Sequence, residues 1–154
     1  MISLSTNLKA KAATTQFTKF DYNSMVKMGN KYLCASDQGL FELKGDTDNS
    51  ENILSYFEPI TMDFGISQEK RLRAVYFGYE ANGDIFLTVS TDLGLSEVYT
   101  VPATTNGQQA RKIIISRSIH GRYWTFHFQS TGCFFAIDHI SILPIVRGHG
   151  FDTN

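Results

Sequence analysis

The sequence has few charges and no long apolar run. Charged residues make up 19% of its 154 positions, and 14 Lys+Arg against 15 Asp+Glu leave a formal net charge of −1. A protein that binds nucleic acid by neutralising phosphates needs a clustered excess of Lys and Arg, so this balance argues against that class. No apolar stretch approaches the roughly 18 residues of a membrane span, and the N-terminal residues do not form a signal peptide.

Only two cysteines are present, Cys34 and Cys133, and neither has a partner at metal-ligand spacing. Isolated cysteines of this kind are usually buried free thiols, which is what we expect here. A disulfide between them stays open, because spacing alone does not decide pairing.

Aromatic residues, in contrast, are abundant: they make up 13% of the chain, with 12 Phe, 7 Tyr and 1 Trp. A chain with many aromatics and few charges suits a surface that other chains partly cover. The clearest pattern lies between Arg122 and Gln129, where Trp124, Phe126 and Phe128 alternate with polar or mixed residues. This period of two predicts a half-buried strand.

The N-terminal third is expected to differ from the rest. Its first segment is polar, rich in Thr and Ala and without a sustained period, which suits an extended arm. Turn signals at Gly29-Asn30 and at residues 36–39 then separate three short strands of a meander. The polar stretch KGDTDNSEN marks a boundary. The expected domains are an arm (1–15), a β-meander with polar connection (16–52), a β-sandwich (53–147) and a flexible tail (148–154).

From Ile53 onward the sequence predicts strand after strand. Asn82-Gly83 is a hairpin turn signal, and Pro59, Pro102 and Pro144 mark strand edges or ends. Strands are expected over residues 53–64, 72–79, 85–91, 97–101, 112–116, 122–129, 134–137 and 139–146.

These short strands, with frequent turns and no convincing helix, predict an all-β fold. We expect an antiparallel β-sandwich, jelly-roll-like, rather than a barrel, because polar loops of unequal length separate the hairpins. The expected core residues are Ile85, Leu87, Val89, Trp124, Phe126, Phe128, Ile140 and Ile142.

Two short motifs have plain interpretations. Asp63–Gly65 spells a protein-kinase motif, but no Gly-rich loop or His-Arg-Asp triplet accompanies it, so we interpret it as a strand end. Asp46, Asp48 and Ser50 alternate as in a calcium loop, yet Glu51 stands where that loop requires glycine. We therefore expect a solvated loop there.

No constellation points to catalysis or to a metal. The chain has no Gly-x-Ser-x-Gly, and its cysteines lack a local His or Asn. Asp84 and Glu97 could face one cleft as a carboxylate pair, although nothing selects them. We therefore expect no enzyme, cofactor or metal. The histidines are expected to be structural or exposed: His120, His127, His139 and His149.

A short basic cluster, Lys70-Arg71-Leu72-Arg73, begins the strand expected over 72–79. In a near-neutral chain such residues fit the rim of a subunit interface, where Arg is favoured, better than a nucleic-acid site. The predicted interface residues are Lys70, Arg71, Arg73, Arg122 and Arg147. Exposed tyrosines offer an alternative, a sugar-stacking platform, for which the candidates are Tyr76, Tyr79, Tyr99 and Tyr123.

Three longer segments occur together in this order: NSMVKMGNKYLCASDQGLFEL, YFEPITMDFGISQEKRLRAVYFGYEANGDIFLTVSTD, and GRYWTFHFQSTGCFFAIDHISILPIV followed by Arg147. Over about residues 23 to 147 the chain resembles a group of bacteriophage structural proteins from the tail or head–tail region. The shared features are the Asp-Phe-Gly…Lys-Arg-Leu-Arg strand entry, the Gly-Arg-Tyr-Trp strand and the closing Leu-Pro-hydrophobic-Arg.

The resemblance implies a virion protein of the tail or neck, made in the host cytoplasm and without enzymatic activity. Several copies would assemble around the tail axis, so the expected partners are further copies and neighbouring tail or neck proteins, with no direct nucleic-acid readout and no membrane span. Two alternatives remain: a carbohydrate-binding sandwich for host recognition, and a small hydrolase on a jelly roll.

Overall fold

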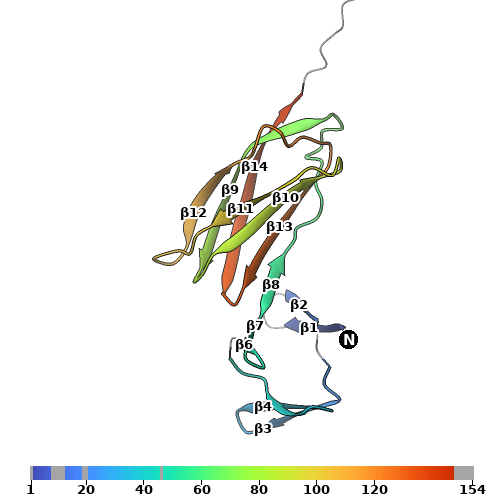
Figure 1. Cartoon of the computed structure of the whole chain (residues 1–154), viewed down its shortest axis with the longest axis vertical. Helices are drawn as coiled ribbons and strands as arrows, with labels where there is room; N and C mark the ends of the chain where they lie inside the picture. The colour runs from blue at the N-terminus through green and yellow to red at the C-terminus, as the bar shows by residue number, and fades with distance from the viewer. Residues whose placement is uncertain (1, 8–12, 19–20, 46, 148–154) are drawn as a thin grey trace, which may run out of the picture. The chain divides into compact units, whose positions relative to one another are not determined.

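A computed structural model describes residues 2–7, 13–18, 21–45 and 47–147, the first two segments by their backbone alone. All regular elements in these residues are β-strands, and every strand pair is antiparallel (Figure 1). The all-β, antiparallel fold class is therefore confirmed. No helix in the described residues is long and apolar enough to cross a membrane. The expected tail, 148–154, lies outside the described residues.

The chain divides into two compact units, Met1–Gly45 and Asp46–Asn154. In the first unit, residues expected to form an extended arm pair instead as a hairpin of β1 (Ile2–Asn7) and β2 (Ala13–Thr18). The β-branched content of these segments favours strand pairing over a single extended arm. The expected meander is present as β3, β4 and β5, which span Ser24–Met28, Lys31–Ser36 and Gly39–Glu42.

The second unit begins inside the polar connection. A small hairpin, β6 (Thr47–Asp48) and β7 (Glu51–Asn52), occupies the part that was expected to be a loop. Its two central residues, Asn49 and Ser50, have φ values of 47° and 71°. Positive φ at both central positions defines the turn whose twist matches that of the flanking strands, so a hairpin forms despite the polar sequence.

The rest of the second unit forms two sheets with strand orders β11-β10-β13-β8 and β12-β9-β14. Buried side chains from both sheets form one core cluster, so the sheets pack face to face as a sandwich. A jelly-roll order within it stays a prediction. The strands are β8 (Leu54–Phe57), β9 (Lys70–Ala81), β10 (Ile85–Thr91), β11 (Ser96–Val101), β12 (Gln109–Ile114), β13 (Trp124–Thr131) and β14 (Phe135–Val146).

The core follows the predicted alternation on the central strands. The three aromatic residues of β13 and the three aliphatic residues of β10 are fully buried, and their register places Val89 opposite Phe126 and Leu87 opposite Phe128. Ile140 and Ile142 are only partly buried, because β14 is an edge strand that pairs with β9 alone among the strands the structure describes. The expected core is thus confirmed at its centre and looser at this edge.

Two irregularities separate the observed strands from the expected ones. The segments expected as two strands, 134–137 and 139–146, form the single strand β14 with a bulge at Asp138. This bulge lies against Gly78 of β9, where an added Cβ would approach an Asp138 carboxylate oxygen to 2.1 Å. A second bulge, at Arg73 of β9, puts Leu72 on the core side and leaves Arg73 exposed, so Arg73 does not share the buried face of Val75.

Replacing Trp124 by Ala tests the centre of the core. Trp124 is fully buried, and its indole N–H donates to the carbonyl oxygen of Gly121 at 3.2 Å. The substitution leaves a cavity and is expected to lower the free energy of unfolding by roughly 3–5 kcal/mol in a denaturant titration. Val98→Ala, at an exposed position, serves as the control. A loss below about 1 kcal/mol would contradict the burial of Trp124.

Candidate functional site

The outer face of the β12-β9-β14 sheet carries large apolar side chains that nothing in the described chain covers. Ile114 and Leu143 flank Ala74 on either side in the strand register, and their side chains are 71% and 45% exposed. One step further along β9, Tyr76 is also exposed, with the Lys112 ammonium 5.4 Å from its ring centre. A continuous apolar strip of this kind on a sheet face is typical of an interaction surface.

A hollow of about 460 Å³ lies at the end of this strip where β9 begins and β14 ends. Its lining combines three guanidinium groups with aliphatic side chains and contains no carboxylate: Arg71, Leu72, Arg73, Ile114, Ile115, Arg117 and Ile145. No hydrogen bond or ion pair in the described chain engages the side chains of the three arginines. We call this place the arginine hollow.

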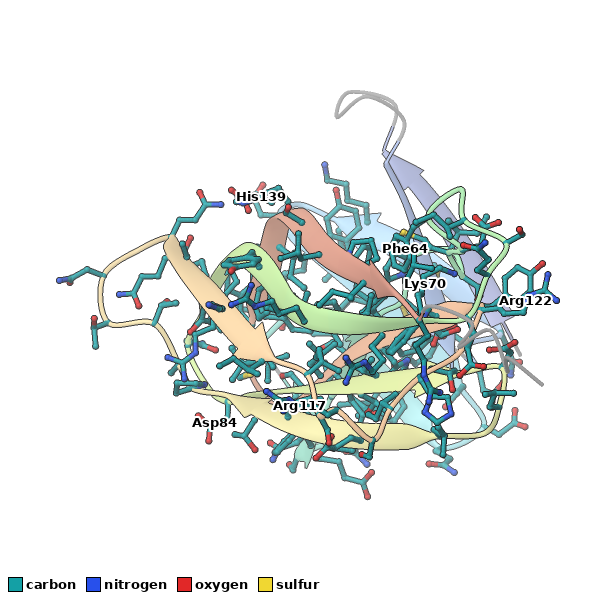
Figure 2. The ribbon with its side chains drawn as sticks, turned by 90° about the horizontal axis from the view of Figure 1, so that it is seen from above. Phe64, Lys70, Asp84, Arg117, Arg122 and His139 are labelled. Atoms are coloured by element: carbon teal, nitrogen blue, oxygen red, sulfur yellow. The ribbon has the colours of Figure 1, made fainter. Side chains whose placement is uncertain are left out.

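Strand register, a bulge and one backbone hydrogen bond place the three arginines around the hollow. Arg71 lies opposite Ile145 in the register, and the bulge at Arg73 turns that side chain out of the core. The amide of Ile115 donates to the carbonyl oxygen of Arg73 at 3.3 Å, which holds the end of β12 beside β9. Arg117, labelled in Figure 2, follows Ile115 by two residues and therefore also lines the hollow. The sequence did not predict that Arg117 would lie near Arg71 and Arg73.

Of the five predicted interface residues, the structure brings Arg71 and Arg73 together and places the other three elsewhere. The prediction that Lys70 lies at an interface is wrong, because its side chain is fully buried and cannot form a surface contact. Its ammonium donates to the carbonyl oxygen of Arg122 at 2.6 Å, while the exposed Arg122 side chain lies at the rim near the ring of Tyr123 (Figure 2). Arg147 is exposed and ion-paired with Glu69 at 2.5 Å.

Lys70 ties β9 to the segment that leads into β13. Its amide and carbonyl also exchange hydrogen bonds with Gly121, at 3.0 and 3.1 Å. Burial lowers the pKa of Lys70 below its usual value, the carboxylates of Asp63 and Asp92 oppose this, and the Arg122 charge reinforces it. The buried ammonium is therefore a structural clamp held by a carbonyl and by nearby negative charge.

The four candidate tyrosines do not share a face. Tyr79 is buried and its hydroxyl donates to the carbonyl oxygen of Pro102 at 2.8 Å. Tyr99 is half-buried, donates to Glu97 at 2.6 Å and accepts from the amide of Ser116 at 2.9 Å. Burial, followed by the bond to Glu97, raises the pKa of Tyr99 to about 12. Tyr76 and Tyr123 remain exposed; Tyr76 lies on β9, and Tyr123 lies just before β13 begins.

The predicted carboxylate pair is also separated. Asp84 precedes β10 and accepts from the amide of Ala103, whereas Glu97 pairs with Val89 near the other end of that strand. In the part of the chain that the structure describes, no group of three or more His, Cys, Asp or Glu could hold a metal ion. Cys34 and Cys133 are free thiols.

Each described histidine lies beside one carboxylate. His120 is 3.4 Å from Glu69, His127 is 2.9 Å from Glu58, and His139 is 2.6 Å from Asp138. These single contacts fit structural or exposed histidines; His149 lies outside the described residues, as does Asp46 of the alternating acidic loop. In the kinase-like triplet, the Asp63 carboxylate accepts from the amide of Gly65 at 2.9 Å, as in a turn.

Comparison with known proteins found no matching family model, no matching curated protein and no matching solved structure.

The clamp at Lys70 predicts a specific dependence of stability on pH. Because folding lowers the pKa of Lys70, the unfolded chain binds this proton more tightly, and stability rises with pH up to the ordinary lysine value of 10.5. The free energy of unfolding of the wild type should therefore rise relative to that of Lys70→Met as the pH approaches 10.5 from below. Lys112→Met, at an exposed position, should follow the wild type. Parallel profiles for wild type and Lys70→Met would contradict the shift.

Proposed function

We propose that this protein is a non-enzymatic structural component that acts by assembling with further copies and with neighbouring structural proteins. The observation that carries the proposal is the uncovered apolar strip on the outer face of the β12-β9-β14 sheet, where Ile114 and Leu143 flank Ala74. Burying such side chains contributes about 25 cal/mol per Å² of apolar area, so a covering chain stabilises the sheet.

The meander of the first unit supports the same proposal. Among its described residues only Cys34 is buried, while apolar side chains on β3, β4 and β5 and directly after β5 are exposed: Met25, Val26, Met28, Tyr32, Leu40 and Leu43. A three-stranded sheet needs a covered hydrophobic face for independent stability. A neighbouring subunit would supply that cover.

The setting we propose is a bacteriophage tail or neck, on the resemblance of residues 23–147 to structural proteins of that region. In such a particle, copies of one chain arranged around an axis contact each other through two different surfaces, and the contacts close into a ring when the rotation allows. The charge deficit, at 19% charged residues, suits a surface covered in this way.

A carbohydrate-binding module is the second candidate, and it has less support. Two of its four candidate tyrosines are engaged in the fold, and the two exposed rings, Tyr76 and Tyr123, each have a cation within 6.0 Å of the ring centre. A sugar platform needs exposed rings that face the same ligand. Tyr76 lies on β9, whereas Tyr123 lies in the segment that leads into β13, a strand of the other sheet.

Self-association of the purified chain tests the proposal. We expect oligomers in multi-angle light scattering and rings or stacks in negative-stain micrographs. Leu143→Lys places a charge in the apolar strip and should weaken the association at least about tenfold, because charge is disfavoured at an interface core. Leu93→Lys, exposed in the turn between β10 and β11, is the matched control.

A monomer at all concentrations that binds glycans on an array with micromolar affinity would contradict the proposal and favour the carbohydrate-binding alternative. Equal weakening by Leu143→Lys and Leu93→Lys would contradict the role assigned to the apolar strip.

A further inference from the structure

We propose that the arginine hollow of one copy binds the β6-β7 hairpin of a second copy, so that the chains join head to tail. This inference rests on the proposed function, because it names the partner for one part of the assembly surface. The hollow supplies three guanidinium groups, and the hairpin supplies the carboxylates of Asp48 and Glu51.

The hairpin presents its two carboxylates together. Asp48 and Glu51 are direct cross-strand partners, so their side chains lie on the same face, and both are exposed. Like charges in this arrangement destabilise a hairpin unless a cation lies between or above them. No ion pair in the described part of the chain engages either carboxylate. The hairpin therefore carries negative charge that a cationic surface would compensate.

The arginine hollow complements the β6-β7 hairpin in charge and in apolar surface. A guanidinium binds a carboxylate through two parallel hydrogen bonds, and three of them exceed the charge of two carboxylates. The aliphatic lining can receive the apolar residues that follow the hairpin, Ile53 and Leu54, whose side chains are 44% and 56% exposed. The volume of about 460 Å³ is sufficient for a few side chains.

The two surfaces lie at opposite ends of the second unit. The hairpin is held where β13 ends, because the carbonyl oxygen of Ile53 accepts from the amide of Gly132 at 2.9 Å. The nearby start of β14, Phe135, pairs with Ala81 at the end of β9, whereas Arg71 lies at the beginning of β9. At roughly 3.3 Å per residue, β9 separates them by about 30 Å. The hairpin cannot reach the hollow of its own chain, so the contact joins different copies.

Charge-neutralised variants test this contact by complementation. Variant H carries Asp48→Asn and Glu51→Gln, and variant R carries Arg71→Gln and Arg73→Gln. Each variant alone lacks one side of the contact, and its self-association should be weakened at least about tenfold in sedimentation velocity at low salt. An equimolar mixture retains one intact pair, the hairpin of R in the hollow of H. It should therefore form a dimer that does not extend further.

Matched controls separate this contact from a general charge effect. Glu80→Gln and Arg111→Gln neutralise exposed charges on the same sheet but outside the hairpin, the hollow and the apolar strip, and they should associate like the wild type. The wild-type association should weaken as sodium chloride is raised from about 50 to 500 mM, because salt screens exposed charge pairs. Circular dichroism of every variant checks that it is folded.

The outcomes distinguish this inference from the proposed function. If the wild type assembles and variants H and R assemble equally well, the hairpin–hollow contact is wrong while the assembly role stands. If H and R lose assembly but their mixture forms no dimer, the contact is likewise wrong. A wild type that stays monomeric overturns both.

Discussion

The edge-to-face contact between Phe77 of β9 and Phe128 of β13, with ring centres 5.4 Å apart, joins the two sheets of the second unit. Around it lie the buried side chains of β10 and Trp124, all fully excluded from solvent. The proposals for the surface depend on this contact, because it fixes which side of β9 faces the core and so which side faces outward. The outer face carries the apolar strip, and the arginine hollow lies at the end of that strip, where β9 begins and β14 ends.

Alternation in the sequence was sufficient to predict the central strands. Residues 85–91 and the aromatic triplet from Trp124 to Phe128 have a strict period of two, and the structure places them as expected. The prediction of two separate strands, 134–137 and 139–146, was wrong because a bulge interrupts the period there. The bulges at Asp138 and Arg73 each insert a residue, which shifts every later side chain to the other face. No local pattern indicates such an insertion, because it depends on the partner strand.

The residues of the arginine hollow could be predicted from the sequence only in part, because their meeting depends on the partner strands. The cluster of Arg71 and Arg73 is visible in the sequence, but Lys70 beside them is buried, since the hydrogen bonds with Gly121 and the Arg122 carbonyl draw it inward. Arg117 joins the cluster only through the tertiary bond between Ile115 and Arg73. Charge in a sequence identifies which residues could bind an anion. The register of three strands decides which of them lie together.

The long edge of β14 has a consequence for how copies can and cannot join. Among the described residues its 12 residues pair with β9 alone, so a strand from another molecule could add at the other edge. The bulge at Asp138 and Pro144, which has no amide hydrogen, limit the regular part of that edge to residues 139–143. A strand from another copy could therefore pair regularly with β14 over five residues at most. Contacts between copies are then more favourable at the outer face of the sheet and at the ends of the sandwich.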